Sequence, residues 1–133
     1  MHRNVVIALL ILTSCLWLGC AVEPEPTATI QELHQLVTSG ADPFVLDVRS
    51  EGEFLSRRMA FVDVRISVDS LEAQSNLLPT DKSVAIYCVG YAEEQSKQAV
   101  KTLVALGYTR ALYVVGGLKA WAEASFETTG GEL

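Results

Sequence analysis

The sequence predicts an α/β fold in which helices flank a central parallel sheet. Apolar, β-branched runs at 44–48, 83–88 and 111–115 are typical of buried strands. Amphipathic helical segments separate these runs, and this alternation is the pattern of parallel sheets. The 133 residues suit one domain, and a hydrophobic content of 50% is enough for a substantial core.

The first half of the chain carries two predicted strands and three predicted helices. Thr29 can cap a helix over 30–37, because Ile30, Leu33 and Val37 fall on one face. After the strand at 44–48, the pattern predicts a short helix at 51–54, an alternating strand at 62–66 and a short helix at 69–77.

The second half begins with the strand that ends at Cys88. A polar loop follows it, then an amphipathic helix at 95–106 that stops at Gly107. The strand at 111–115 is broken by Gly116-Gly117, and a short helix covers 118–124. Residues 127–133 are predicted to be a flexible tail.

Cys88 is the leading candidate for chemistry because of its place before the polar loop. At a strand-to-helix turn, a thiol meets backbone N–H groups and the positive end of a helix dipole, which favour the nucleophilic thiolate. Ligands of parallel α/β sheets also bind beyond the carboxyl ends of the strands. The alternative is a small core residue, since free cysteine is among the most buried types.

Charge and composition exclude several classes of function. The formal net charge is −6 and no basic stripe is present, so nucleic acid is not an expected partner. No cysteine or histidine cluster has metal-ligand spacing, which predicts no metal site. His34 stands alone and is expected on a solvated helix face. Trp121 is expected in the core.

Residues 1–19 predict an export signal, with Arg3 in a positive segment before the apolar run at 5–12. Residues 16–20 resemble a bacterial lipobox, in which Cys20 is lipidated, and 20–28 would then be a tether. Cys15 fits the same pattern, but cleavage there would leave apolar residues on the tether. The remaining alternative is an uncleaved anchor, which the apolar run through Val22 is long enough to form.

Both alternatives predict a protein of the cell envelope, anchored to a membrane and facing outside the cytoplasm. In a cell with two membranes this is the periplasmic side, and Ala21 after Cys20 gives no signal for retention at the inner membrane. An acidic domain is weakly repelled by anionic lipid, so the lipid anchor is expected to hold it there. Cys88 would be a lone thiol in an oxidising compartment.

Four stretches, in this order and spacing, resemble the single-domain rhodanese-like family of sulfurtransferases. They are Leu46-Asp47-Val48-Arg49 with Glu53-Phe54, residues 63–71, Tyr87-Cys88, and Leu106-Gly107-Tyr108 with residues 115–121. The resemblance makes 29–126 a rhodanese-like domain, with a central parallel sheet flanked by helices. Asp47 is expected to support the site loop, while Arg49 either reaches the site or pairs with Glu53.

The resemblance implies that Cys88 takes a sulfane sulfur from a small donor, becomes a persulfide and passes the sulfur to a thiol or protein acceptor. It implies no metal or organic cofactor, and a monomer is expected. Backbone N–H groups of the loop would hold the donor. The residues expected to contact it are Val89, Gly90, Tyr91, Ala92, Glu93, Glu94, Gln95 and Ser96.

The loop departs from the family pattern. Many active members have an arginine five residues after the cysteine, where this chain has Glu93 followed by Glu94, and the loop is longer by about two residues. Two carboxylates disfavour thiosulfate as the donor and raise the pKa of Cys88. Lys97 is expected to be solvated. Without the arginine, phosphatase or arsenate chemistry is not expected.

Three functions therefore remain open from the sequence. The first is a membrane-tethered sulfurtransferase that forms a persulfide on Cys88 and uses a donor other than thiosulfate. The second is a catalytically degenerate rhodanese-like module that binds a protein partner. The third is a thiol redox sensor, which would need a partner thiol because the domain holds no second cysteine.

Overall fold

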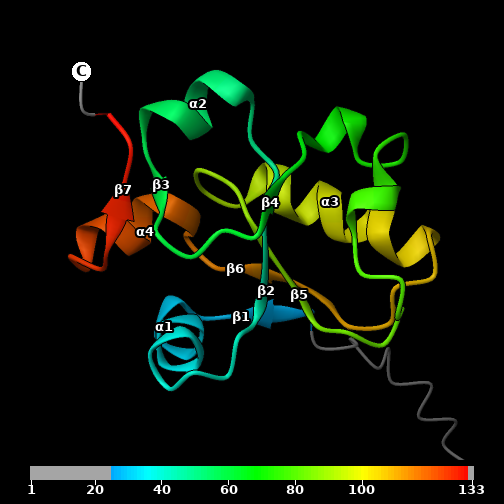
Figure 1. Cartoon of the computed structure of the whole chain (residues 1–133), viewed down its shortest axis with the longest axis horizontal. Helices are drawn as coiled ribbons and strands as arrows, with labels where there is room; N and C mark the ends of the chain where they lie inside the picture. The colour runs from blue at the N-terminus through cyan, green and yellow to red at the C-terminus, as the bar shows by residue number, and fades with distance from the viewer. Residues whose placement is uncertain (1–24, 132–133) are drawn as a thin grey trace, which may run out of the picture.

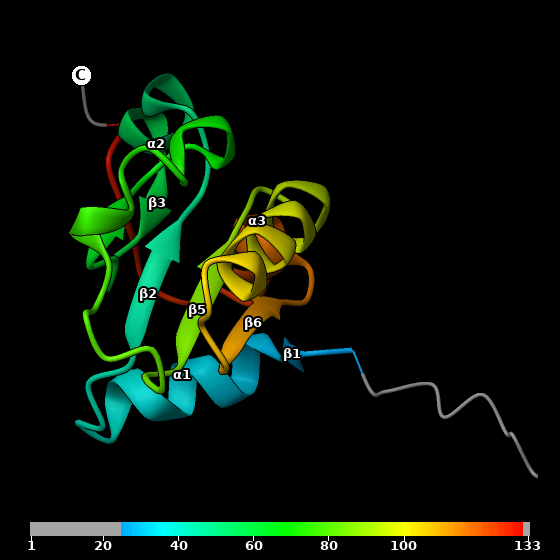
Figure 2. The same cartoon turned by 90° about the vertical axis from the view of Figure 1, so that its right-hand side faces the viewer.

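The computed structural model describes residues 25–131, and these form a five-stranded sheet with helices on both faces (Figures 1 and 2). All neighbouring strands of this sheet are parallel, in the order β1-β6-β5-β2-β4. The fold class predicted from the sequence is therefore confirmed. The strands are β1 (Thr27–Ala28), β2 (Phe44–Asp47), β4 (Val64–Arg65), β5 (Ile86–Val89) and β6 (Ala111–Val114).

Within residues 25–131, four helices and two 3₁₀ turns surround the sheet. They are α1 (Ile30–Thr38), α2 (Glu51–Ser56), α3 (Glu94–Ala105), α4 (Gly117–Glu123), η1 (Val68–Ser70) and η2 (Ser75–Leu77). The predicted helix at 69–77 is thus two separate 3₁₀ turns. Thr29 caps α1 as predicted, through a capping box with Glu32. Figure 2 shows α2 beyond the carboxyl end of β2 and α3 alongside β5 and β6.

The two faces of the sheet bury separate cores. α3 covers one face, where Ala99 and Leu103 pack with Ile86 and Cys88 of β5. α1 and α4 cover the other face, where Leu33 and Trp121 pack with strand residues that include Val89. Alternation along β5 produces this division, since successive side chains of a strand point to opposite faces. The core position predicted for Trp121 is confirmed.

The C-terminal segment is ordered where the sequence predicted a flexible tail. β7 (Thr128–Thr129) pairs antiparallel with β3 (Arg58–Met59), beside α4 in Figure 1. The carbonyl of Glu127 accepts from the indole N–H of Trp121 at 2.9 Å and from the backbone N–H of Ala60 at 3.2 Å. The tail prediction is wrong for residues 127–129 because these tertiary hydrogen bonds and the pairing with β3 hold the segment. Residues 132–133 lie outside the described part.

His34 is half-buried, contrary to the prediction of a solvated helix face. Its ring stacks on Phe126, with centroids 3.9 Å apart, and meets the edge of Trp121 at 5.7 Å. The return of the chain after α4 brings Phe126 against α1, which periodicity along α1 cannot reveal.

The leader and most of the tether, including Cys15 and Cys20, lie outside the described residues. Within residues 25–131, no helix is both long and apolar enough to cross a membrane.

Candidate functional site at the loop after β5

Cys88 does not open the loop, because β5 continues for one residue beyond it. Its side chain is 0% exposed and lies in the core beneath α3. Burial raises the pKa of the thiol far above its ordinary value, since the low dielectric interior disfavours the charged form. The expectation of a thiolate stabilised at the loop is therefore not met. Strand alternation directs this side chain into the core.

Gly90 is the residue that opens the loop. It is buried, and its φ lies outside the left-handed region, so the backbone there does not require glycine. A Cβ at this position would lie 3.5 Å from the backbone nitrogen of Ser96 and 3.4 Å from the Cβ of Gln95, both in the first turn of α3. The place predicted for the Cys88 thiol is thus the place that a side chain at position 90 would take.

The sequence did carry a signal for this assignment. If the loop begins at Cys88, it is about two residues longer than the family pattern. If it begins at Gly90, its length agrees with that pattern. The shift of two preserves strand alternation, because residues 88 and 90 share a parity. Periodicity alone therefore could not separate the two positions, and only the observed end of β5 does so.

The carbonyl groups of the loop are held by the start of α4. The backbone N–H groups of Leu118 and Lys119 donate to the carbonyls of Gly90 and Tyr91, each at 2.9 Å. A Cβ on Gly117 would approach the carbonyl oxygens of residues 90, 91 and 92 to within 2.4–2.8 Å, and its φ is +55°. Glycine is thus required here because the loop backbone lies too close for a side chain. The sequence predicted a role for this glycine only in the turn that ends the strand at 111–115.

Backbone N–H groups of the loop take no part in these contacts. Among hydrogen bonds of the described residues, none is donated by a backbone N–H between Gly90 and Ser96. At the start of a helix such groups have no intrahelical acceptor. The loop between Gly90 and Ser96 therefore offers a run of backbone N–H donors, and Gly90 places no side chain among them.

Glu93, which lies five residues after Cys88, has a structural role. One carboxylate oxygen accepts from the backbone N–H of Gly116 at 3.2 Å, and the other pairs with Lys97 at 3.2 Å. The hydrogen bond that the Lys97 ammonium group donates to the Glu93 carboxylate raises the pKa of Lys97. Lys97 is thus engaged rather than simply solvated, and Glu93 joins α3 to the turn after β6. Glu94 is exposed.

Ser96 and Gln95 complete the first turn of α3. Ser96 is buried and its hydroxyl donates to the Glu93 carbonyl at 2.9 Å. Gln95 is half-buried, and its side chain hydrogen bonds to the carboxylate of Glu53. Ser96 therefore ties the first turn of α3 to the end of the loop, and Gln95 links that turn to α2.

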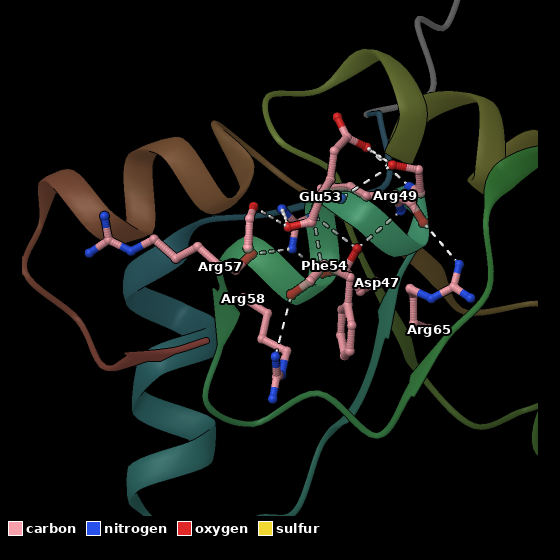
Figure 3. A network of polar contacts seen from close by, with 9 residues as sticks. Asp47, Arg49, Glu53, Phe54, Arg57, Arg58 and Arg65 are labelled. Carbon is pink, nitrogen blue, oxygen red and sulfur yellow. Dashed lines mark hydrogen bonds and ion pairs between the residues drawn. The ribbon is translucent and has the colours of Figure 1, made fainter. Parts of the chain in front are cut away.

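Asp47 and Arg49 form a buried ion pair beside the loop (Figure 3). Arg49 Nη2 donates to Asp47 Oδ2 at 2.7 Å, and Arg49 Nε donates to both carboxylate oxygens. The same guanidinium donates to the carbonyls of Glu53 and Arg57 at 3.3 and 2.8 Å. Asp47 is structural as expected, but it holds Arg49 rather than the loop. Arg49 pairs with Asp47 and contacts Glu53 through its carbonyl only.

A pocket of about 480 Å³ lies between α2, the loop and α4. Tyr91 lines it and is 54% exposed, while Leu118 supplies an apolar wall. Arg57 and Lys119 also line it, and neither forms an ion pair with a described residue. Arg49 borders the pocket but is only 2% exposed, since its nitrogens are taken by protein acceptors. Among residues 25–131, no group of three or more potential metal ligands is found.

The chain belongs to the rhodanese-like family: the family model named Rhodanese-like domain matches residues 29–124. A protein named sulfurtransferase from Allochromatium vinosum is 29% identical over 92 residues, which cover 69% of this chain and 83% of that protein. The class predicted from the sequence motifs is thereby confirmed.

Solved structures agree with this assignment. The solution structure of a rhodanese-like domain from Anabaena gives a TM-score of 0.72 at 26% identity, covering 80% of each chain. A thiosulfate sulfurtransferase from Pseudomonas aeruginosa gives a TM-score of 0.69 at 23% identity, covering 78% of this chain and 20% of that one. The second match concerns the fold alone.

Proposed function

We propose that this chain is an exported, membrane-tethered rhodanese-like module that binds a protein partner at the loop after β5 and does not transfer sulfur. The proposal rests on one observation: the domain's cysteine is buried in β5, and Gly90 stands where a reactive side chain would meet the first turn of α3. A thiol can attack a donor only as an accessible thiolate. Burial and a raised pKa oppose both requirements at Cys88.

The pocket beside Tyr91 is the surface that suits a partner. An exposed aromatic side chain next to an apolar wall is typical of the anchors of protein interfaces. Arg57 and Lys119 line the pocket together with Glu53 and Glu123, so it offers both signs of charge to polar groups of a partner. The tether on Cys20 would keep the module at the membrane, facing outside the cytoplasm.

The second candidate is sulfur transfer through Cys88 with a donor other than thiosulfate. Family membership and the sulfurtransferase relative favour it. It requires β5 to open locally so that the thiol becomes accessible. A redox sensor at Cys88 requires the same exposure.

Intact-protein mass spectrometry separates the two candidates. The reduced protein is exposed in turn to thiosulfate, mercaptopyruvate and polysulfide. We expect no gain of sulfur, because the thiol is buried. A gain of one sulfur that disappears in Cys88→Ala would establish the sulfurtransferase and overturn the binding module.

Partner binding is tested by in-cell photocrosslinking. A photoreactive phenylalanine analogue replaces Tyr91, and the matched control carries it at Leu77, which is also exposed at 50%. We expect a discrete adduct from position 91 and none from position 77. Equal adducts, or none from either position, would contradict a partner site at the loop.

A further inference from the structure

A shallow groove of about 420 Å³, here called the α3–β1 groove, lies between α3, Tyr113 of β6 and residues 25–26, which lead into β1. Its apolar lining comes from Pro26, Val100 and Val104. Val104 is 59% exposed, and neither the loop after β5 nor its pocket uses it. Val104 thus places exposed aliphatic carbon at this groove.

The rim of this groove carries positive charge although the protein as a whole is acidic. Lys97 and Lys101 both line it. Lys101 forms no ion pair with a described residue, and Lys97 is paired with Glu93 while its side chain stays 37% exposed. The carboxylate of Glu25 at the same groove accepts a hydrogen bond from the Tyr113 hydroxyl. The surface thus combines exposed aliphatic carbon with ammonium groups.

The tether enters the domain at this groove. Residues 27 and 28 pair with β6, and the Pro26 carbonyl accepts from the backbone N–H of Tyr113 at 2.9 Å. The chain is therefore fixed to the sheet from Pro26 onward. A lipid on Cys20 would be separated from Glu25 by a span that can reach at most about 17 Å. The groove is then among the surfaces nearest to the bilayer.

We propose that the α3–β1 groove is the face with which the tethered domain contacts the lipid headgroups, with Val104 at the headgroup level and Lys97 and Lys101 beside lipid phosphates. This inference rests on the proposed lipidation of Cys20. Long lysine side chains can lie along apolar surface and place their ammonium groups at the interface. A short tether makes this weak contact effective, because it holds the face at high local concentration.

The experiment measures which face of the full mature chain meets the membrane. The chain is expressed with its own leader, purified from membranes and reconstituted into vesicles of phosphatidylethanolamine and phosphatidylglycerol that carry a nitroxide on the headgroup. A bimane fluorophore is attached at Val104→Cys or, as a matched control, at Leu55→Cys in α2. Both parent side chains are 59% exposed, whereas Cys88 is buried and stays unlabelled. α2 lies away from β1 in both views (Figures 1 and 2).

We expect nitroxide quenching at position 104 to exceed that at position 55 by about threefold, as only one face meets the headgroups. Lys101→Glu should lower the quenching at 104 by about twofold, while Lys119→Glu, a charge reversal at an exposed residue of α4, should leave it unchanged. Equal quenching at 104 and 55 in a chain that floats with the vesicles would overturn the membrane face alone. A chain that does not float with them would overturn both the lipidated tether and the face that depends on it.

Discussion

Residue 90 is a glycine that the backbone does not require, and this distinguishes it from Gly117 in the same site. Gly90 has an ordinary φ and room for a Cβ, whereas Gly117 has neither. Cys88 carries the reactive sulfur atom, but strand alternation directs its side chain into the core and not toward the loop. The loop can therefore be separated experimentally from the thiol.

Moving the thiol from position 88 to position 90 tests the assignment of the site. In Gly90→Cys combined with Cys88→Ala, we expect a thiol that reacts rapidly with an alkylating reagent and has a pKa below that of free cysteine, because it meets the first turn of α3. Wild-type Cys88 should react only when the protein unfolds. The measurement is the pH dependence of alkylation rates. Similar rates in the two proteins would place Cys88, not residue 90, at the loop.

Neutralising Asp47 tests the buried ion pair. In Asp47→Asn, the Arg49 guanidinium keeps its charge without its carboxylate partner, and loss of one member of a buried pair costs about 3–5 kcal/mol of unfolding free energy. Urea unfolding measures this loss. The control is Asp69→Asn, which is exposed and should change stability by less than about 0.5 kcal/mol. Equal effects would mean that the pair contributes nothing beyond a surface charge.

At the scale of elements, the loop depends on the start of α4 as much as on α3. Two hydrogen bonds from α4 hold loop carbonyls, and Glu93 joins α3 to the turn before α4. The loop therefore keeps its shape without a substrate. A rigid loop of this kind suits a binding surface, because little conformational entropy is lost when a partner arrives.

Gly117→Ala should disturb this junction. Its Cβ would meet three loop carbonyls in addition to the strain of a left-handed backbone, so we expect a loss of about 3 kcal/mol or more of unfolding free energy. Gly40→Ala is the matched control, because its φ of +79° is also left-handed but nothing lies within 4 Å of its Cβ. It should show the backbone strain alone, about 1–2 kcal/mol. A loss no greater in Gly117→Ala than in Gly40→Ala would contradict the contact between α4 and the loop.

At the scale of the whole molecule, the buried thiol couples folding to pH. The pKa of Cys88 is raised in the folded state, so the folded protein holds the proton that the unfolded chain releases. This contribution to stability is fully present below the ordinary thiol pKa of 9.0 and decreases as the pH rises above it. The folded pKa lies so high that the decrease continues throughout the accessible alkaline range.

Above the ordinary thiol pKa, we expect the unfolding free energy to fall by about 1.4 kcal/mol per pH unit through this one group. Cys88→Ala should remove that component. Denaturant unfolding of both proteins between neutral and alkaline pH gives the difference, in which other titrating groups such as Tyr113 cancel. Parallel pH profiles would show that the thiol is not buried in the folded state.

The sequence by itself determined the α/β class, the capped helix at Thr29, the rhodanese-like family and the loop between β5 and α3. These features depend on local periodicity, capping and motif order, which neighbouring residues encode. The tertiary structure alone decided that Cys88 is a core residue, that Gly90 opens the loop, that Arg49 pairs with Asp47 and that the tail forms β7. A strand's final residue and the partner of a buried charge depend on contacts between segments far apart in the chain, and residue patterns along one segment do not contain them.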